Sequence, residues 1–141
     1  VIGWAIATNS ISLESIAFFL IIFFWTPSHF WALSLYKADD YKKAGIPMLP
    51  VTNGIQDTKK NIFIYSLLMI PTIIFPYYIG FVGEIFLSLC LILTFYYNLI
   101  CFQLYNYKLG KFNIKKAKHV FSYSIVYLFL IFVFFLIDKI L

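Results

Sequence analysis

One stretch of sequence decides the fold: residues 15–35 read SIAFFLIIFFWTPSHFWALSL, a run without a single Asp, Glu, Lys or Arg. A helix of about 20 apolar residues crosses the roughly 30 Å of hydrocarbon in a bilayer. Three more runs of this kind follow, at residues 62–82, 85–104 and 120–137. Each run is expected to be helical, because lipid offers no hydrogen-bond partners to an open backbone. The sequence therefore predicts an all-α membrane protein with four transmembrane helices.

The composition agrees with this prediction. Of 141 residues, 62% are apolar and only 12% are charged, whereas soluble domains average about 45–50% apolar and about 25% charged residues. Cys90 and Cys101 would lie roughly 16 Å apart along one helix, which is beyond the reach of a disulfide. A soluble enzyme, a disordered tail and a disulfide scaffold are therefore excluded.

Lysine placement orients the four predicted helices. The formal net charge is +5, and ten of the eleven basic residues, all lysines, lie in the connections 36–61 and 105–119. Short lysine-rich loops stay on the cytoplasmic side of a membrane, so both connections are expected there. Because these lysines lie between apolar runs and not on a soluble basic face, the expected partners are anionic lipid head groups or a phosphorylated substrate, and not nucleic acid.

The connection 36–61 holds the chain's candidates for chemistry. Tyr36, Asp39, Asp40 and Lys43 are spaced by three and four residues, so a helix continuing past residue 35 would gather them on one side. Carboxylates in such a place can hold Mg²⁺, which uses one or two of them together with phosphate oxygens of a substrate. The alternative is a solvated helix face on which Asp and Lys form ordinary ion pairs.

His29 is the second candidate, because an ionisable side chain at membrane depth is a functional hypothesis by default. Trp25 lies one turn before it, and Trp31 follows two residues later. A neutral imidazole would suit a haem, either as an iron ligand or as a contact for a propionate. The alternative is an imidazole bonded to a carbonyl or to another helix. His119, at the end of a lysine-rich connection, is expected to be interfacial.

Two quoted stretches, WTPSHFWAL at residues 25–33 and DDYKKAGIPMLPV at residues 39–51, resemble the protoheme IX farnesyltransferases (haem O synthases). These form a branch of the UbiA-type superfamily of intramembrane prenyltransferases. VIGWA at residues 1–5 and FSYSIVYLFL at residues 121–130 are similar to the same family, so the likeness covers nearly the whole chain. Members are about twice this length. The resemblance implies that these residues are the C-terminal half of one nine-helix bundle, and that an N-terminal half is missing here.

The resemblance also implies an activity: transfer of a farnesyl group from farnesyl diphosphate to a vinyl group of haem b, giving haem O, with Mg²⁺ bridging to the diphosphate. Haem b is then a substrate and not a cofactor. Asp39 and Asp40 match the second Asp-rich motif and so its metal site, and Lys43 matches its basic diphosphate contact. Tyr36 stands where the superfamily often has a further Asp. The implied substrate-binding residues are His29, Trp25, Trp31 and Tyr36.

The first Asp-rich motif of the superfamily, Asn-x-x-x-Asp-x-x-x-Asp, has no match in this sequence. The chain alone is therefore expected to be inactive. Two alternatives stay open: another UbiA-type prenyltransferase, acting on an aromatic acid precursor of a quinone, and a non-enzymatic multipass membrane subunit. The bias toward Lys, Ile, Phe and Tyr, and the lack of a targeting presequence, favour a bacterial inner membrane.

Overall fold

The computed structural model describes residues 1–47, 50 and 54–141. Its long helices are α2 (Leu13–Tyr36), α5 (Ile55–Tyr78), α6 (Glu84–Tyr105) and α7 (Ile114–Ile140). All four are long and apolar enough to cross a membrane, which confirms the predicted all-α fold with four spans. The chain is thus part of an integral multi-pass membrane protein. Two short helices, α1 (Ile2–Thr8) and α3 (Ala38–Lys43), lie outside these spans.

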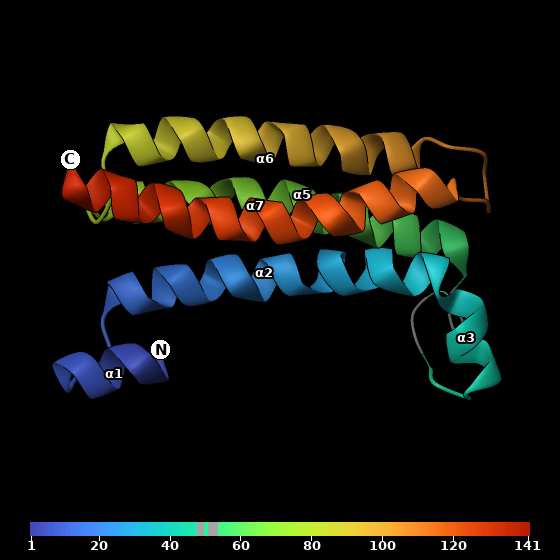
Figure 1. Ribbon diagram of the computed structural model, residues 1–141, viewed down its shortest axis with the longest axis horizontal. Helices are drawn as coiled ribbons and strands as arrows, with labels where there is room; N and C mark the ends of the chain where they lie inside the picture. Colours follow the sequence, from blue (N-terminus) through green and yellow to red (C-terminus); the bar gives the residue numbers. More distant parts are fainter. Residues whose placement is uncertain (48–49, 51–53) are drawn as a thin grey trace.

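The four long helices alternate in direction and close into a ring. Both α2 and α6 pack against α5 and α7, and Figure 1 shows α6 and α2 on opposite sides of the α5–α7 pair. In the same view, α3 and the connection 106–113 lie at one end of the bundle. We call this the lysine-rich end. The other end carries α1, residues 79–83 and the C-terminus, so the two lysine-rich connections do share one end.

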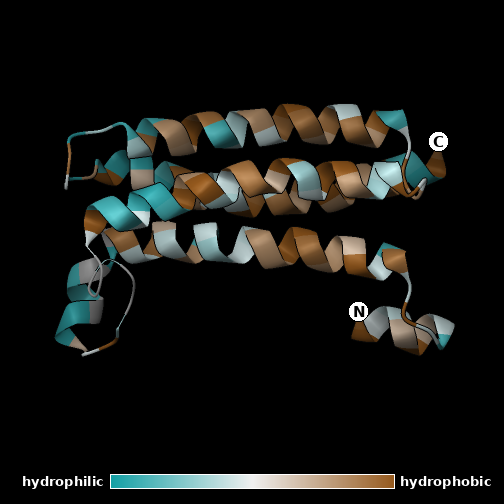
Figure 2. Ribbon diagram, turned by 180° about the vertical axis from the view of Figure 1, so that it is seen from behind, coloured by the Kyte–Doolittle hydropathy of each residue, from teal (hydrophilic) through white to brown (hydrophobic). Residues whose placement is uncertain are grey.

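Polarity is distributed along the bundle as a bilayer requires. Hydrophilic residues gather toward the lysine-rich end, while the middle of the helices is mostly hydrophobic (Figure 2). Large apolar side chains point outward from the middle of the bundle, with Phe95 64% and Phe129 67% exposed. An outward apolar surface of this kind suits lipid or further helices of a longer protein.

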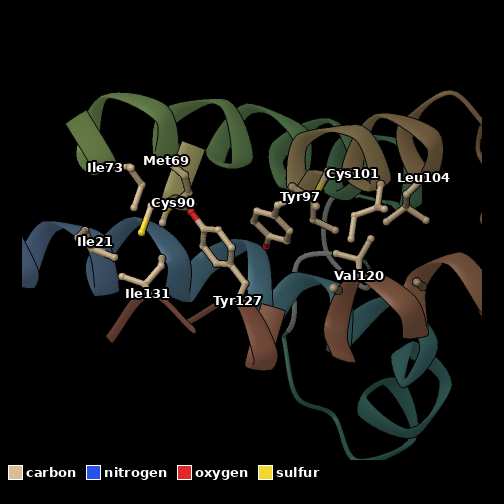
Figure 3. Packing of buried hydrophobic residues seen from close by; sticks show 14 of the residues in the cluster. Ile21, Met69, Ile73, Cys90, Tyr97, Cys101, Leu104, Val120, Tyr127 and Ile131 are labelled. Atoms are coloured by element: carbon tan, nitrogen blue, oxygen red, sulfur yellow. The ribbon is translucent and has the colours of Figure 1, made fainter. Parts of the chain in front are cut away.

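Inside the ring, tyrosines pack among aliphatic side chains (Figure 3). Small polar residues are buried there as well. The rings of Tyr97 and Tyr127 stack with centroids 5.1 Å apart. The Tyr97 hydroxyl lies 2.6 Å from the Oγ of Ser28, and the Tyr127 hydroxyl lies 2.9 Å from the Oγ of Thr94. These bonds join α2, α6 and α7, as expected for membrane bundles in which polar side chains bridge neighbouring helices.

The expectation that one unbroken helix carries Tyr36, Asp39, Asp40 and Lys43 is wrong. The helix α2 ends at Tyr36, and Lys37, with φ −109° and ψ 11°, separates it from α3. The new helix suits its sequence, because Asp39 and Asp40 fall in its first turn and lysines in its last, where each complements the helix dipole. Gly45, at φ 69°, follows in the left-handed conformation that often ends a helix.

Candidate functional site

The best-defined part of the site surrounds His29 on α2. Its ring is stacked against Trp25 on one side, with centroids 4.3 Å apart and an interplanar angle of 18°. On α7, the Phe121 ring is also stacked on it, at 4.7 Å and 23°. The imidazole is half-buried in this aromatic sandwich, so its rotation is restricted while one edge stays accessible.

A serine on α7 binds the Nδ1 edge of the His29 ring and leaves the Nε2 edge accessible. The Nδ1 atom of His29 lies 2.5 Å from the Oγ of Ser124, whose hydroxyl donates to the Phe121 carbonyl at 2.6 Å. Because a hydroxyl has one proton to donate, His29 must be the donor at Nδ1 in this arrangement. The Nε2 atom then carries a lone pair, and among the described residues it has no hydrogen-bond partner. A neutral imidazole with a free Nε2 can ligate iron or accept a hydrogen bond.

The tryptophans predicted beside His29 lie on two sides of α2. Trp25 faces α7, where its Nε1 donates to the Ser124 carbonyl at 2.9 Å. Trp31 instead makes an edge-to-face contact with Tyr65 of α5, at 5.1 Å and 81°. The structure therefore brings Trp25 to His29, whereas Trp31 lies between α2 and α5.

The carboxylates lie outside the bundle, on α3. Asp39 and Asp40 are exposed, as is Lys43. One oxygen of Asp40 lies 3.9 Å from the Nζ of Lys37, in an i,i+3 pair of exposed side chains. This is the ordinary ion pair that the alternative interpretation of the loop predicts, and such exposed pairs contribute little to stability. A diphosphate could displace it at small cost.

The donor set fits Mg²⁺ only in part. In the described part of the chain, no three His, Cys, Asp or Glu side chains come together as a metal site. Mg²⁺ can nevertheless be held by one or two carboxylates plus waters and substrate phosphates. Asp39 and Asp40 provide that minimum, and Lys43 in the last turn of α3 supplies a cation for the same phosphates. Among the described residues no third carboxylate, imidazole or thiol joins them.

The two parts of the site are connected through α2. His29 precedes the end of that helix, at Tyr36, by seven residues, which is about 10 Å along the helix axis. The backbone of Tyr36 is described, but its side chain lies outside the described part, and its predicted role as a substrate contact stays a prediction.

Sequence reasoning missed the contacts of three residues. Phe121 and Ser124 come from α7, far along the chain from His29, and only their spacing of three in FSYS places both on one helix face. Lys59, expected in a solvated loop, is fully buried. Its Nζ donates to the carbonyls of Tyr107, Lys108 and Lys111, at 3.5, 3.2 and 2.6 Å.

Comparison with known proteins places this chain in a family. The profile of the UbiA prenyltransferase family matches residues 1–125. A protoheme IX farnesyltransferase of Pelagibacter ubique is 73% identical over 141 residues, which is 100% of this chain and 46% of that protein. A protein of the same name from Parvibaculum lavamentivorans is 44% identical over 140 residues, covering 99% of this chain and 44% of its own length. Another, from Ralstonia nicotianae, is 42% identical over 137 residues, covering 97% of this chain and 43% of its own length.

The chain thus spans about half the length of the curated relatives it matches. No solved structure matches it.

Proposed function

This chain belongs to the UbiA prenyltransferase family, and from that premise we propose that it is part of an enzyme that farnesylates haem b to haem O. The observation that carries the proposal is the 73% identity, over all 141 residues, to a protoheme IX farnesyltransferase. In the proposed reaction, the bond between the farnesyl C1 and the diphosphate oxygen breaks, and the diphosphate leaves with the electron pair. A carbon–carbon bond forms to a vinyl carbon, water adds its oxygen to the other vinyl carbon, and a proton is released.

The α3 residues are proposed to serve the diphosphate. Asp39 and Asp40 would hold Mg²⁺, and Lys43 would contact a phosphate oxygen directly. When bound, the metal neutralises the charge that grows on the departing diphosphate. The exposed position of these side chains at the lysine-rich end supports this assignment, because a charged diphosphate is strongly disfavoured at membrane depth.

The α2–α7 seam is proposed to serve the haem. A porphyrin is flat and apolar over most of its surface, and the face of the aromatic sandwich is of the same kind. The lone pair on His29 Nε2 would ligate the iron or accept a hydrogen bond from a propionic acid group. Trp25, Trp31 and Tyr36 are proposed as further substrate contacts along the same helix.

The 141 residues are proposed to be the C-terminal half of the enzyme's single domain, with the other Asp-rich motif in the rest of the protein. The cavity for substrates would then lie between the two halves, so the chain alone should bind parts of the substrates without joining them. We further propose that the membrane is a bacterial inner membrane, with the lysine-rich end facing the cytoplasm.

The proposal is tested with membranes that contain the full-length protein, supplied with farnesyl diphosphate, haem b and Mg²⁺. Asp40→Asn should lower the yield of haem O at least 100-fold. Asp57→Asn is the matched control, because Asp57 is also an exposed carboxylate, in the first turn of α5, and its loss should leave the yield within twofold. Equal yields from both variants would favour a non-enzymatic role for the loop.

Haem binding separates the proposal from a quinone-branch prenyltransferase. Titration of the full-length protein with haem b should give a shifted Soret band that His29→Ala weakens or removes. A protein that gives no spectral response to haem, and that prenylates an aromatic acid, would belong to the other branch.

A further inference from the structure

A small groove lies at the lysine-rich end, between the last turns of α6 and the first turns of α7. Its volume is about 170 Å³. Ile100 and Gln103 of α6 line one wall, and Lys115, Lys116 and His119 of α7 line the other. The groove is distinct from the candidate site, because its lining includes no residue of α3 and no member of the aromatic sandwich around His29. In Figure 1, α3 lies beside α2, whereas the groove is formed by α6 and α7.

The groove is positively charged and uncompensated. Within the part of the chain that the structure describes, neither Lys115 nor Lys116 forms an ion pair with a carboxylate. The Nζ of Lys116 instead lies 5.9 Å from the centre of the Tyr107 ring. Two ammonium groups beside one small concavity, together with an amide from Gln103, provide hydrogen-bond donors for a single anion such as a phosphate.

His119 is held in place at the edge of this groove. Its Nε2 lies 3.0 Å from the hydroxyl of Tyr96 on α6. Below this pair, toward the middle of the bundle, the rings of Tyr96 and Tyr123 meet edge to face with centroids 4.8 Å apart. The Tyr123 hydroxyl donates to the Leu93 carbonyl at 2.9 Å, so the α6–α7 seam under the groove has a fixed aromatic lining.

The depth of the groove in the membrane favours a phospholipid as its ligand. It lies where α6 ends, at Tyr105, and α7 begins, at Ile114, which is the level of lipid head groups for helices of this length. The tyrosines beneath it are amphipathic side chains of the kind found at that depth, and Tyr96 is 43% exposed on the outer surface. The same opening therefore offers cations to a phosphate and an aromatic, partly exposed seam to the glycerol and acyl chains.

We propose that this α6–α7 groove binds the phosphate of an anionic phospholipid from the surrounding leaflet. Lys115 and Lys116 neutralise the phosphate, and Gln103 and His119 hydrogen-bond to its oxygens or to the glycerol. The acyl chains run along the seam past Tyr96 and Tyr123. A specific lipid at this position would brace the connection between α6 and α7, and the assignment does not depend on the haem chemistry.

The test measures how much phosphatidylglycerol the full-length protein keeps in native mass spectra after its release from detergent micelles. The groove variant is Lys115→Gln with Lys116→Gln. The control is Lys108→Gln with Lys111→Gln, which removes the same charge from the same connection but from lysines outside the groove lining. We expect the groove variant to retain roughly tenfold less lipid, given that each lysine near the surface contributes appreciably to binding, and the control to stay within twofold of the unaltered protein.

A folding control and a competition with inorganic phosphate accompany this measurement. Helix content from circular dichroism must match in both variants, and if the double variant unfolds, Gln103→Leu with His119→Leu replaces it and should lose lipid in the same way. Excess inorganic phosphate should fail to displace the lipid. Equal losses from the groove and control variants, or displacement by inorganic phosphate, would overturn the proposal, the first pointing to general charge attraction and the second to a soluble phosphate ligand.

Discussion

The Nδ1 atom of His29 lies 2.5 Å from the Ser124 Oγ, across the seam between α2 and α7. The two residues are 95 positions apart in sequence, yet the bond determines which imidazole nitrogen is left for a ligand. Trp25 and Phe121 stack on the two faces of the same ring. The candidate haem contact is therefore held on three sides by this chain itself.

Ser124→Ala should weaken haem binding by about tenfold, because loss of one hydrogen bond to a positioned group costs about 1 kcal/mol or more. The imidazole would then be free to adopt the other tautomer. Ser122→Ala is the control, since Ser122 is exposed on the same helix and its change should leave haem affinity within twofold. Titration followed at the Soret band measures both variants, and equal affinities in the two would remove Ser124 from the site.

Lys59→Met should loosen the connection between α6 and α7. The buried ammonium group donates to three carbonyls of that connection, and hydrogen bonds to charged groups contribute about 1.5–3 kcal/mol. Amide hydrogen exchange over residues 106–113 should rise at least tenfold. Lys60→Met, at an exposed position one residue on, removes the same charge and should leave this exchange unchanged. Protection that survives in the Lys59 variant would contradict the role of the buried ammonium group.

Tyr97→Phe should lower the free energy of unfolding by about 1 kcal/mol, the usual size of an interhelical hydrogen bond in membrane proteins. The lost bond runs from the Tyr97 hydroxyl to Ser28, and Ser28 keeps its bond to the Trp25 carbonyl at 3.1 Å. Unfolding in mixed micelles with increasing denaturant measures this free energy. Tyr78→Phe, at a residue 84% exposed, should change it by less than about 0.5 kcal/mol, and similar losses for the two would refute the interior network.

Gly83→Ala should also destabilise the bundle, by about 1 kcal/mol. A Cβ at Gly83 would lie 2.8 Å from the Oδ1 of Asp138. That carboxylate accepts hydrogen bonds from the Gly83 and Phe86 amides at the start of α6, at 2.9 and 3.4 Å, and would have to give them up to move away. Gly3→Ala, where an added Cβ meets nothing within 4 Å, should be neutral or slightly stabilising. Thermal unfolding that shifts equally in both variants would show that the Asp138 contact contributes nothing.

The uncharged runs predicted the spanning helices, but not their full lengths. The run at residues 62–82 became a helix that begins at Ile55, because Asp57 suits a first turn and Lys59 found carbonyl partners inside the protein. The break at Lys37 was not predicted either, since spacing alone does not reveal that Asp39 and Asp40 begin a helix of their own. The spacing of residues within a segment predicts a helix there, but it does not show where that helix begins or ends.

The contacts around His29 could be predicted only in part. His29 and Trp25 were identified from their place within a span, and the structure brings them together. Their partners Phe121 and Ser124 lie on a helix distant in sequence, so only the packing of α2 on α7 could reveal them. The assignments of Asp39, Asp40, Lys43 and Tyr36 to a substrate remain predictions.

The most direct test of the proposed activity is the mass of the haem extracted after full-length protein has been incubated with farnesyl diphosphate, Mg²⁺ and two competing acceptors. The acceptors are haem b and an aromatic acid of the kind that precedes a quinone. We predict that haem b gains one farnesyl group and one hydroxyl group while the aromatic acid is recovered unchanged. A haem of unaltered mass beside a prenylated aromatic acid, or two unaltered acceptors, would contradict the account.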